Sequence, residues 1–512
     1  MRLHAQFLSL GASLTGLLLA ASPSFADSVK PHCMAMDVTA QHQQDKATKA
    51  YMEATPPLWS NLGSLTYPIT TRSTEAQHYF DQGLKLNVNF NHAEAQRAFR
   101  QARKLDPGCA MCYFGEALVL GPNINVPMAP EANAPALAAL RKAQSLASTA
   151  SDKERALIAA LALRYSDDQG AERAALDAAF ADAMSLLADK YPDDLQIAVL
   201  ASEAAMVTQP WDYWQPGGHE PKGRTARTLK LLEGVLATQP DHPGAIHLYI
   251  HLVEASDRPE RAESHADRLA SLMPGAGHIV HMPSHIYHRV GRHRDSLEAN
   301  KAAAAVDEAY IAETGAVGVY PVGYYAHNLH FVLISAQALG DRQNVLAHAD
   351  KLDRSLSNDV AAAIPMTQPI KAAPYFAYAQ YAAPESILSL PDPAGAPPYV
   401  KAMWHYARGV AHAAMKDPAL ARAEAAAIER LGRESDWSAF DATAIPARAV
   451  LEVAKNVVLA RAAQTEKDHA SAVALFEKAV AAEDTLPYME PPYWYYPVRQ
   501  SLEEARLSLA AR

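Results

Sequence analysis

Small and apolar residues recur along this chain at helical spacing, and alanine fills long stretches between them. Because alanine is the strongest helix former, these stretches predict helices, as do the patterned segments 177–191 and 195–208. The clearest set occupies positions 4, 8, 20, 24, 27 and 32 of a 34-residue frame that begins at Ala76: Tyr79, Gly83, Ala95, Phe99, Ala102 and Pro107. Glycine and alanine permit close approach of two helices, and proline ends the second one. The frame therefore predicts helices that pack closely against one another at these positions.

The frame recurs further along the chain. Tyr113 and Ala117 fit a second unit. Later units begin at Pro243, Gly277, Ala326, Ala402 and Val453. This recurrence resembles the tetratricopeptide repeat (TPR), in which two antiparallel helices pack through the same small and aromatic positions. The resemblance implies an all-α protein over most of the chain from Ala76 onward: a TPR-like helical-hairpin solenoid with a concave groove.

The start of the chain has the pattern of a secretory signal peptide. Arg2 precedes an apolar run from Phe7 to Ala21, and Ser24 and Ala26 are the small residues that a signal peptidase reads. The run is shorter than the roughly 20 residues that a membrane span needs. We therefore expect cleavage near Asp27 and a periplasmic or secreted protein that is soluble and has no membrane span after cleavage.

The expected organisation has five parts. They are a signal peptide at 1–26, an N-terminal extension at 27–75, an N-terminal TPR-like helical region at 76–208, an aromatic and proline-rich loop at 209–224, and a C-terminal TPR-like solenoid with a His-rich groove at 225–512. The loop is expected to lie over the groove.

Composition narrows the function further. The chain is 512 residues long, 49% hydrophobic and 20% charged, which fits a folded protein and argues against wholesale disorder. The net charge of −10 argues against a nucleic-acid partner, because phosphate binding needs a basic surface. The sequence contains no G-x-S-x-G motif, no P-loop and no dinucleotide fingerprint. Whether the protein is an enzyme is left open by these patterns.

Histidine is concentrated in one part of the chain. Nine of the 21 histidines fall between His242 and His293. In the TPR frame, positions 2, 5, 9 and 12 of each first helix line the groove. These positions hold His247, His251 and Glu254 in one unit, His278, His281, His285 and His288 in the next, and His327 and His330 in the third. The resemblance thus implies that three successive first helices present imidazoles to one groove.

Two H-x-x-x-H pairs sharpen this expectation. His247 and His251 form one pair, and His281 and His285 form the other. On a helix, this spacing places two imidazoles one turn apart on one face, where they can chelate a borderline metal ion. We expect these four to bind one divalent transition ion, copper, zinc or iron, with Glu254, His327 and His330 as further ligands or as their supports. Pro283 lies inside the second pair and is expected to disturb the helix there.

Two other interpretations of the histidines stay open. The groove can bind a peptide or protein partner without any metal, or the imidazoles can be structural. The HExxH glutamate of zinc proteases is missing, since Leu248 and Met282 occupy its place. If an ion has an open coordination position, its bound water can react with a substrate, but no pattern identifies a reaction.

The cysteines carry weaker signals. Cys109 and Cys112 form a C-x-x-C at the junction of the first two units, which is consistent with a disulfide, a redox pair or a local staple. We expect the two to be close enough for oxidation. Cys33 is the third cysteine, and its state is left open.

Longer stretches resemble a widespread group of exported bacterial TPR proteins of unassigned activity. They include HPGAIHLYIHLVEAS, GAGHIVHMPSHIYHRVGR and EPPYWYYPVRQSL. The resemblance spans nearly all of the mature chain and implies fold and location, but it implies no reaction. The residues it places in the motifs of that group are His247, His251, Glu254, His281, His285, His327 and Asn328.

Overall fold

The computed structural model describes residues 46–168 and 170–511. The expected signal peptide and Cys33 lie outside these residues. Residues from Thr48 onward form one unit, in which the described residues are helical apart from turns, loops and one isolated bridge between Trp214 and Pro221. The prediction of an all-α fold without a sheet is confirmed. None of the described helices combines the length and the apolar character that crossing a bilayer requires.

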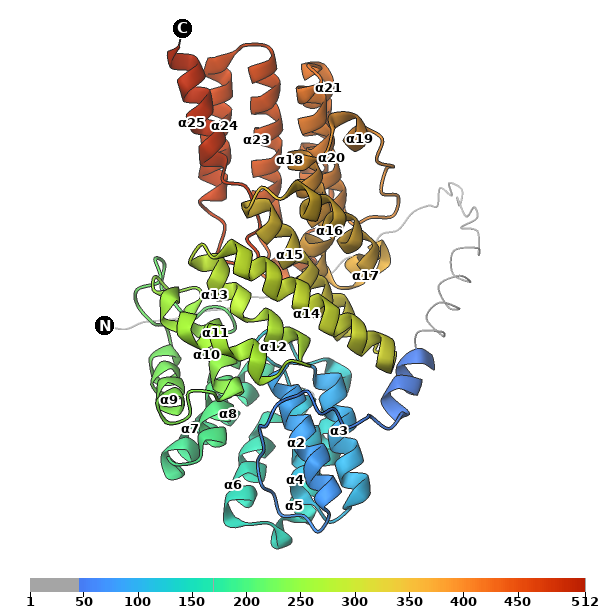
Figure 1. Ribbon diagram of the computed structural model, residues 1–512, viewed down its shortest axis with the longest axis vertical. Coiled ribbons are helices and arrows are strands. Elements are labelled where there is room, and N and C mark those ends of the chain that lie inside the picture. Colours follow the sequence, from blue (N-terminus) through green and yellow to red (C-terminus); the bar gives the residue numbers. More distant parts are fainter. Residues whose placement is uncertain (1–45, 169, 512) are drawn as a thin grey trace, which may run out of the picture. The chain divides into compact units, whose positions relative to one another are not determined.

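Residues 48–53 are helical, and the labelled helices follow in a nearly continuous series (Figure 1). The first of them are α2 (Thr74–Val88), α3 (His92–Leu105), α4 (Ala110–Val119), α5 (Asn133–Ser145), α6 (Asp152–Leu161), α7 (Arg173–Lys190), α8 (Leu195–Val207) and α9 (Thr225–Thr238). Short 3₁₀ turns η1 (Pro130–Ala132), η2 (Ala147–Thr149) and η3 (Ala162–Arg164) join some of them.

The second part of the series carries the histidines. Its helices are α10 (Pro243–Val253), α11 (Glu263–Leu272), α12 (Gly277–His281), α13 (Pro283–Arg289), α14 (His293–Thr314), α15 (Ala326–Ala338), α16 (Arg342–Ser355), α17 (Asn358–Ala363) and α18 (Gln368–Tyr381). They are followed by α19 (Pro384–Leu388), α20 (Pro398–Ala414), α21 (Pro418–Glu434), α22 (Ser438–Ala442), α23 (Ala447–Thr465), α24 (His469–Glu483) and α25 (Val498–Ala510). The connecting turns include η4 (Pro259–Ala262), the π-helical η5 (Tyr320–Tyr325) and η6 (Pro365–Thr367).

The repeat frame predicts where three of the helices begin: Pro243, Gly277 and Ala326, predicted as unit starts, are the first residues of α10, α12 and α15. The other predicted starts, Ala76, Ala402 and Val453, lie inside α2, α20 and α23, a few residues after those helices begin. Each of these helices packs against the helix that follows it, and consecutive helices such as α23 and α24 lie side by side (Figure 1). The protein is therefore a TPR-like solenoid of helical hairpins, as the frame predicts.

Neighbouring helices approach closely at three glycines, of which Gly83 and Gly409 occupy position 8 of the frame. A Cβ atom added to Gly83 on α2 would lie 2.7 Å from the ring of Phe99 on α3, and one added to Gly115 on α4 would overlap the same ring. At the equivalent position in α20, a Cβ on Gly409 would lie 2.6 Å from Val458. Glycine is required at these positions because the neighbouring side chain occupies the space that a larger residue needs.

Three groups of buried apolar residues form the core. The largest runs from Leu62 to Tyr324, a smaller one from Leu297 to Ala377, and a third from Ala372 to Ala505. The histidine-bearing helices α10, α12 and α13 belong to the first group, so their side chains face packed protein on several sides.

Pro283 divides the second histidine helix into α12 and α13, with Met282 between them. Met282 keeps helical backbone angles, φ −52° and ψ −36°, so the interruption is local. Proline at the first position of α13 lacks the N–H that would continue the helical ladder. As a result the two parts stay close to one axis, and His281 and His285 still lie on neighbouring turns.

Cys109 and Cys112 are joined by a disulfide, as their spacing led us to expect. Cys109 is the N-cap of α4, and its sulfur accepts a hydrogen bond from the backbone N–H of Cys112. The bond lies at the turn between α3 and α4, where it staples the start of the second unit.

Candidate metal centre

Three first helices bring their imidazoles together in the interior of the unit. His247 and His251 come from α10, His278 and His281 from α12, His285 from α13 and His327 from α15. All are buried except His327, which is half-buried. Glu254 directly follows α10 and has no exposed surface. The predicted groove positions of these helices are therefore buried inside the protein.

The ligand atoms of these residues fall into three overlapping groups. The groups are His247, His251 and His278; His281, His285 and His327; and His251, Glu254 and His285. Within each group, the ligand atoms all lie within 4.8 Å of one another. The structure thus divides the four predicted ligands between two neighbouring sets, and Glu254 links the sets through His251 and His285.

Hydrogen bonds at Nδ1 fix the orientation of four imidazoles. The acceptors are the Val88 carbonyl for His247 at 2.7 Å, Glu254 Oε1 for His251 at 2.9 Å, Asn300 Oδ1 for His281 at 2.5 Å, and Glu254 Oε2 for His285 at 2.6 Å. The Asn300 amide nitrogen donates to the Ser296 carbonyl, so its oxygen faces His281. Since these oxygens accept, each Nδ1 must donate, and a neutral ring then has its lone pair on Nε2.

The four Nε2 atoms point into the cluster. His281 Nε2 lies 2.8 Å from His285 Nε2, and His247 Nε2 lies 3.1 Å from His278 Nε2. Among the residues that the structure describes, His251 Nε2 has no hydrogen-bond partner. Two lone pairs at 2.8 Å repel each other unless a proton or a cation lies between them. A metal ion satisfies this arrangement at several nitrogens at once, whereas one proton satisfies a single contact.

Among the residues described in the structure, Glu254 is the one carboxylate that bonds directly to the imidazoles of the cluster. Burial alone would raise its pKa, but the charge on His285 and the hydrogen bonds from both imidazoles lower the pKa to about 2. Glu254 is therefore ionised and orients His251 and His285 together. Carboxylates that accept from the outer nitrogen of a metal-binding histidine fix its tautomer and make it a better ligand.

Burial keeps most of the imidazoles neutral. Desolvation, followed by the neighbouring imidazoles, lowers the pKa of His278 and His327 well below the ordinary value. The pKa values of His247 and His281 are also lowered, with desolvation as the largest cause. At His285, burial alone would lower the pKa, but the Glu254 carboxylate raises it. Neutral imidazoles are the form that binds a metal.

Aromatic rings enclose the cluster. Phe90, in the turn between α2 and α3, lies 4.4 Å from the His247 ring and 5.4 Å from the His278 ring. Its φ of 53° is in the left-handed region, which is rare for a bulky residue. On the other side, Phe331 lies 4.9 Å from the rings of both His281 and His285. This shell excludes water and lowers the local dielectric constant.

The aromatic loop at 209–224 also reaches the cluster. The Trp211 ring lies 5.2 Å from that of His251, Tyr213 is buried, and the Trp214 indole donates to the Leu252 carbonyl at 2.7 Å. The loop therefore packs on the end of α10 beside the imidazoles.

Sequence reasoning missed two residues that approach the cluster from the C-terminal part of the chain. The Tyr488 hydroxyl lies 3.2 Å from Glu254 Oε2 and 2.7 Å from Glu490 Oε1. Glu490 is buried, and its other oxygen has no hydrogen-bond partner within the described part of the chain. Burial and then the charge of Glu254 raise the pKa of Glu490 to about 7. Only the motif EPPYWYYPVRQSL contained a signal for this segment.

The remaining predicted residues have different surroundings. His330 lies apart from the three groups, and its Nε2 bonds to the Tyr495 hydroxyl instead. Asn328 donates to Asp307. His278 was left out of the predicted ligand set although it occupies a groove position, and the structure brings it next to His247.

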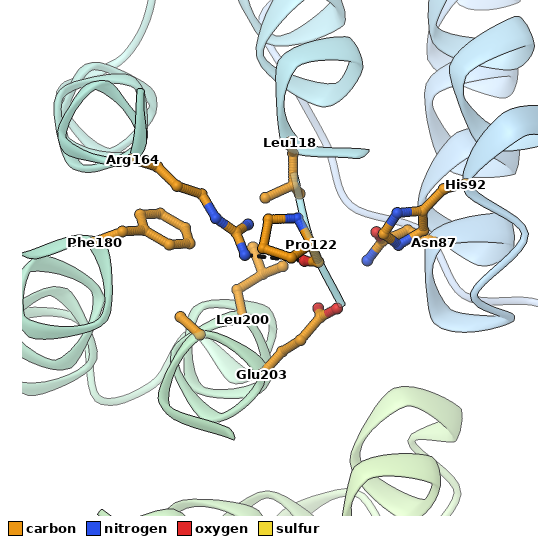
Figure 2. Close-up of a pocket in the computed structure, with 9 residues that line it drawn as sticks. Asn87, His92, Leu118, Pro122, Arg164, Phe180, Leu200 and Glu203 are labelled. Atoms are coloured by element: carbon orange, nitrogen blue, oxygen red, sulfur yellow. Dashed lines mark hydrogen bonds between the residues drawn. The ribbon is translucent and has the colours of Figure 1, made fainter. Parts of the chain in front are cut away.

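A second buried polar cluster shows what a structural site looks like in this protein. Figure 2 shows Arg164 reaching toward Pro122, whose carbonyl accepts at 2.9 Å, with His92 and Glu203 on the same small cavity. Arg164 also pairs with Asp177 at 3.1 Å. The cavity has a volume of about 10 Å³, room for about one water. Here a cation of the chain itself, Arg164, compensates the buried carboxylates. Within residues 46–168 and 170–511, no such cation bonds to the imidazoles of the histidine cluster.

No protein-family model matches the sequence, and no curated protein does either. Similar solved structures include yeast Tom70, with 10% identity and a TM-score of 0.32 over 93% of this chain and 95% of that one. The Cut9–Hcn1 hetero-tetramer has 11% identity and a TM-score of 0.34 over 92% and 82%, and the TPR domain of P58(IPK) has 13% and 0.19 over 86% and 99%. With TM-scores this low, the fold assignment rests on the helices and their packing.

Proposed function

We propose that this protein binds a transition metal in the histidine cluster. The observation that carries the proposal is the convergence of Nε2 lone pairs from imidazoles whose Nδ1 atoms are already bonded to oxygen acceptors. The contact of 2.8 Å between His281 and His285 and the unpartnered nitrogen of His251 are both relieved by a cation. In a fully hydrogen-bonded structural core, each of these nitrogens would have a donor or an acceptor as its partner.

The donor set selects the class of metal. Imidazole nitrogen suits zinc, copper, iron and nickel, whereas calcium and magnesium prefer oxygen. The order of intrinsic affinities favours copper or zinc when several metals are present. Glu254 acts through His251 and His285 and holds their rings in position.

A scaffold that binds a peptide in the groove is supported less well. Groove recognition needs exposed side chains at the groove positions, but His247, His251, His281 and His285 are between 0% and 1% exposed. Phe90, the loop at 209–224 and the segment around Tyr488 cover them. A peptide would have to displace these contacts before it could reach the imidazoles.

The proposed setting is the periplasm of a bacterium or the medium outside it. The n-region, the apolar run and the small residues before Asp27 support export, and so does the resemblance to exported bacterial TPR proteins. The disulfide between Cys109 and Cys112 is compatible with an oxidising compartment.

Metal analysis tests the proposal directly. Purified wild-type protein, equilibrated with Zn²⁺ or Cu²⁺ and desalted, should retain metal in a fixed ratio to protein. The double variant His251→Ala/His285→Ala should lose it. His265→Ala, a half-buried histidine on α11 outside the three groups, is the matched control and should retain the wild-type amount. Wild-type metal content in the double variant, with its helical circular dichroism intact, would refute the metal site.

A further inference from the structure

The six imidazoles separate into two sets with no member in common. We name His247, His251 and His278 the first triad, and His281, His285 and His327 the second triad. Within each set, the ligand atoms lie within 4.8 Å of one another, close enough to hold one ion. A single ion has room for about four protein ligands when it is tetrahedral, so six inward-facing imidazoles exceed what one ion needs.

The distances within each triad fit one ion. Two nitrogens bound to the same metal at about 2.0–2.1 Å, at angles between roughly 90° and 110°, lie about 2.8–3.4 Å apart. The contact between His247 and His278 in the first triad is 3.1 Å, and that between His281 and His285 in the second is 2.8 Å. Both short nitrogen contacts therefore fall inside a triad.

Glu254 joins the two triads symmetrically. Its Oε1 accepts from His251 of the first triad, and its Oε2 accepts from His285 of the second. A carboxylate that orients one ligand in each of two sites places one negative charge between them. Such a charge stabilises two nearby cations better than it stabilises one, because the repulsion between the cations is offset where it is strongest.

A second carboxylate lies on the same side. Glu490 is buried, and Tyr488 lies within hydrogen-bond distance of both it and Glu254. The cationic side chain on this side is Arg289, whose guanidinium lies 5.3 Å from the Tyr488 ring centroid and whose Nε donates to the Glu254 backbone carbonyl. Its described hydrogen bonds go to backbone carbonyls and not to either carboxylate. The Glu254 carboxylate, with Glu490 bonded to the same Tyr488 hydroxyl, offers buried negative charge that metal cations can compensate.

We infer that the cluster is a two-ion centre, with one transition-metal ion in each triad and Glu254 as the shared support. This inference rests on the proposed metal-binding function and adds the number of ions and the division of their ligands. His278 and His327 are ligands in this assignment, whereas the sequence pattern gave the leading role to the two H-x-x-x-H pairs.

Stoichiometry distinguishes the two-ion centre from a single ion. Metal-free full-length mature protein is titrated with Zn²⁺, which has no redox chemistry, and bound zinc is counted by mass spectrometry after desalting. The wild type should bind two ions per chain. His247→Gln/His278→Gln should keep one ion in the second triad, and His281→Gln/His327→Gln should keep one ion in the first.

His330→Gln is the matched control. His330 lies on α15 with His327, is also buried, and bonds to Tyr495 rather than to the cluster. This variant should still bind two ions. If a double variant has lost its unfolding transition, the single variants His278→Gln and His327→Gln replace it, and each should weaken zinc binding at one of the two sites at least tenfold.

The possible results separate the two claims. One ion in the wild type, with loss of that ion in either double variant, overturns the two-ion centre but leaves the proposed function standing. No bound zinc in the wild type overturns both. Anomalous scattering from zinc-loaded crystals gives an independent readout, in which two peaks, one beside each triad, support the inference and a single peak between the triads refutes it.

Discussion

Two His–Glu contacts, in two regions of this protein, differ in their burial and in the other partners of the glutamate. In the histidine cluster, Glu254 bonds to His251 and His285, and all three are buried. In the later hairpin of α20 and α21, Glu424 bonds to His405 and Arg408. There the three side chains are 12%, 16% and 20% exposed, and an arginine supplies permanent positive charge.

The difference shows that burial and the identity of the second partner decide the chemistry of such a contact. A carboxylate paired with arginine has its charge compensated by the chain itself. Glu254 has only imidazoles as bonded side-chain partners apart from the Tyr488 hydroxyl, and those imidazoles have lone pairs facing one another. The α20–α21 contact is therefore structural, whereas the cluster has the composition of a binding site.

The largest expected effect comes from removing the charge of Glu254. Glu254→Gln offers one amide oxygen to two imidazole donors, so one donor is left facing the amide N–H₂. We expect the free energy of unfolding to fall by about 3–5 kcal/mol. Zinc affinity should fall by roughly 10- to 100-fold, because the outer support of a ligand is lost.

Glu424→Gln is the matched variant. Its partners are partly exposed, so we expect a loss of at most about 1 kcal/mol and no change in zinc binding. Urea unfolding and a competitive zinc titration measure both quantities. Equal losses in the two variants would show that burial does not distinguish the two contacts.

Replacing the glycine at position 8 of the frame should have the next largest effect on the free energy of unfolding. The effect should be of similar size in both regions. Gly83→Ala forces a methyl group against Phe99, and Gly409→Ala forces one against Val458. Overpacking of this kind costs about 1–3 kcal/mol. Gly234→Ala on α9 is the control, since nothing lies within 4 Å of its added Cβ, and it should stabilise the helix by up to about 1 kcal/mol. Thermal unfolding of the three variants checks the order.

The disulfide should contribute less to the free energy of unfolding, and its removal should not change metal binding by the cluster. Because it closes a loop of sequence separation 3, its constraint on the unfolded chain is small. Cys109→Ser/Cys112→Ser should lower the free energy of unfolding by about 2 kcal/mol at most. Zinc stoichiometry should not change. A loss of metal in this variant would mean that the first hairpins and the cluster are coupled.

The smallest effect, taken over one pH unit, is a dependence of the unfolding free energy on pH that has opposite signs at Asp307 and at Glu424. Burial raises the pKa of Asp307, near the cluster, to about 7 despite hydrogen bonds from Tyr320 and Asn328. The folded state then holds a proton that the unfolded state loses, so stability falls as pH rises from about 4 to about 7. Burial alone would raise the pKa of Glu424, but hydrogen bonds from His405 and Arg408 lower it, so its contribution is lost as pH falls through the folded pKa.

Each slope amounts to at most about 1.4 kcal/mol per pH unit. Asp307→Asn should therefore gain stability relative to the wild type between pH 4 and 7, whereas Glu424→Gln should gain relative to it only in acid. Urea midpoints across this pH range provide the measurement. Parallel curves for both variants and the wild type would contradict the assignment of opposite signs.

The fold could be predicted from the sequence more fully than the way in which the candidate ligands group in space. The frame predicts that α10, α12 and α15 begin at Pro243, Gly277 and Ala326, because helix starts depend on local residues. It also identifies four imidazoles whose Nε2 atoms converge. These features follow from spacing along one helix, which a sequence displays directly.

The division into triads depends on contacts between distant segments. His278 joins His247 across two helices, and Glu490 comes from beyond the last predicted unit. The Val88 carbonyl that fixes the His247 tautomer is a backbone group, for which no residue type gives a signal. Frame positions indicate which face of a helix a side chain occupies, but they do not indicate what covers that face.

The large sequence separation of these contacts determines when the cluster can form during folding. His247 bonds to a carbonyl 159 residues earlier in the chain, and Glu254 meets Tyr488 234 residues later. Contacts of such separation close late in folding, because the loop entropy must be paid before they form. The early hairpins therefore form before the cluster is complete. The proposed metal loading is then a late step of folding, and a chain from which residues 488–490 are deleted should fold its early hairpins but bind metal with incomplete support.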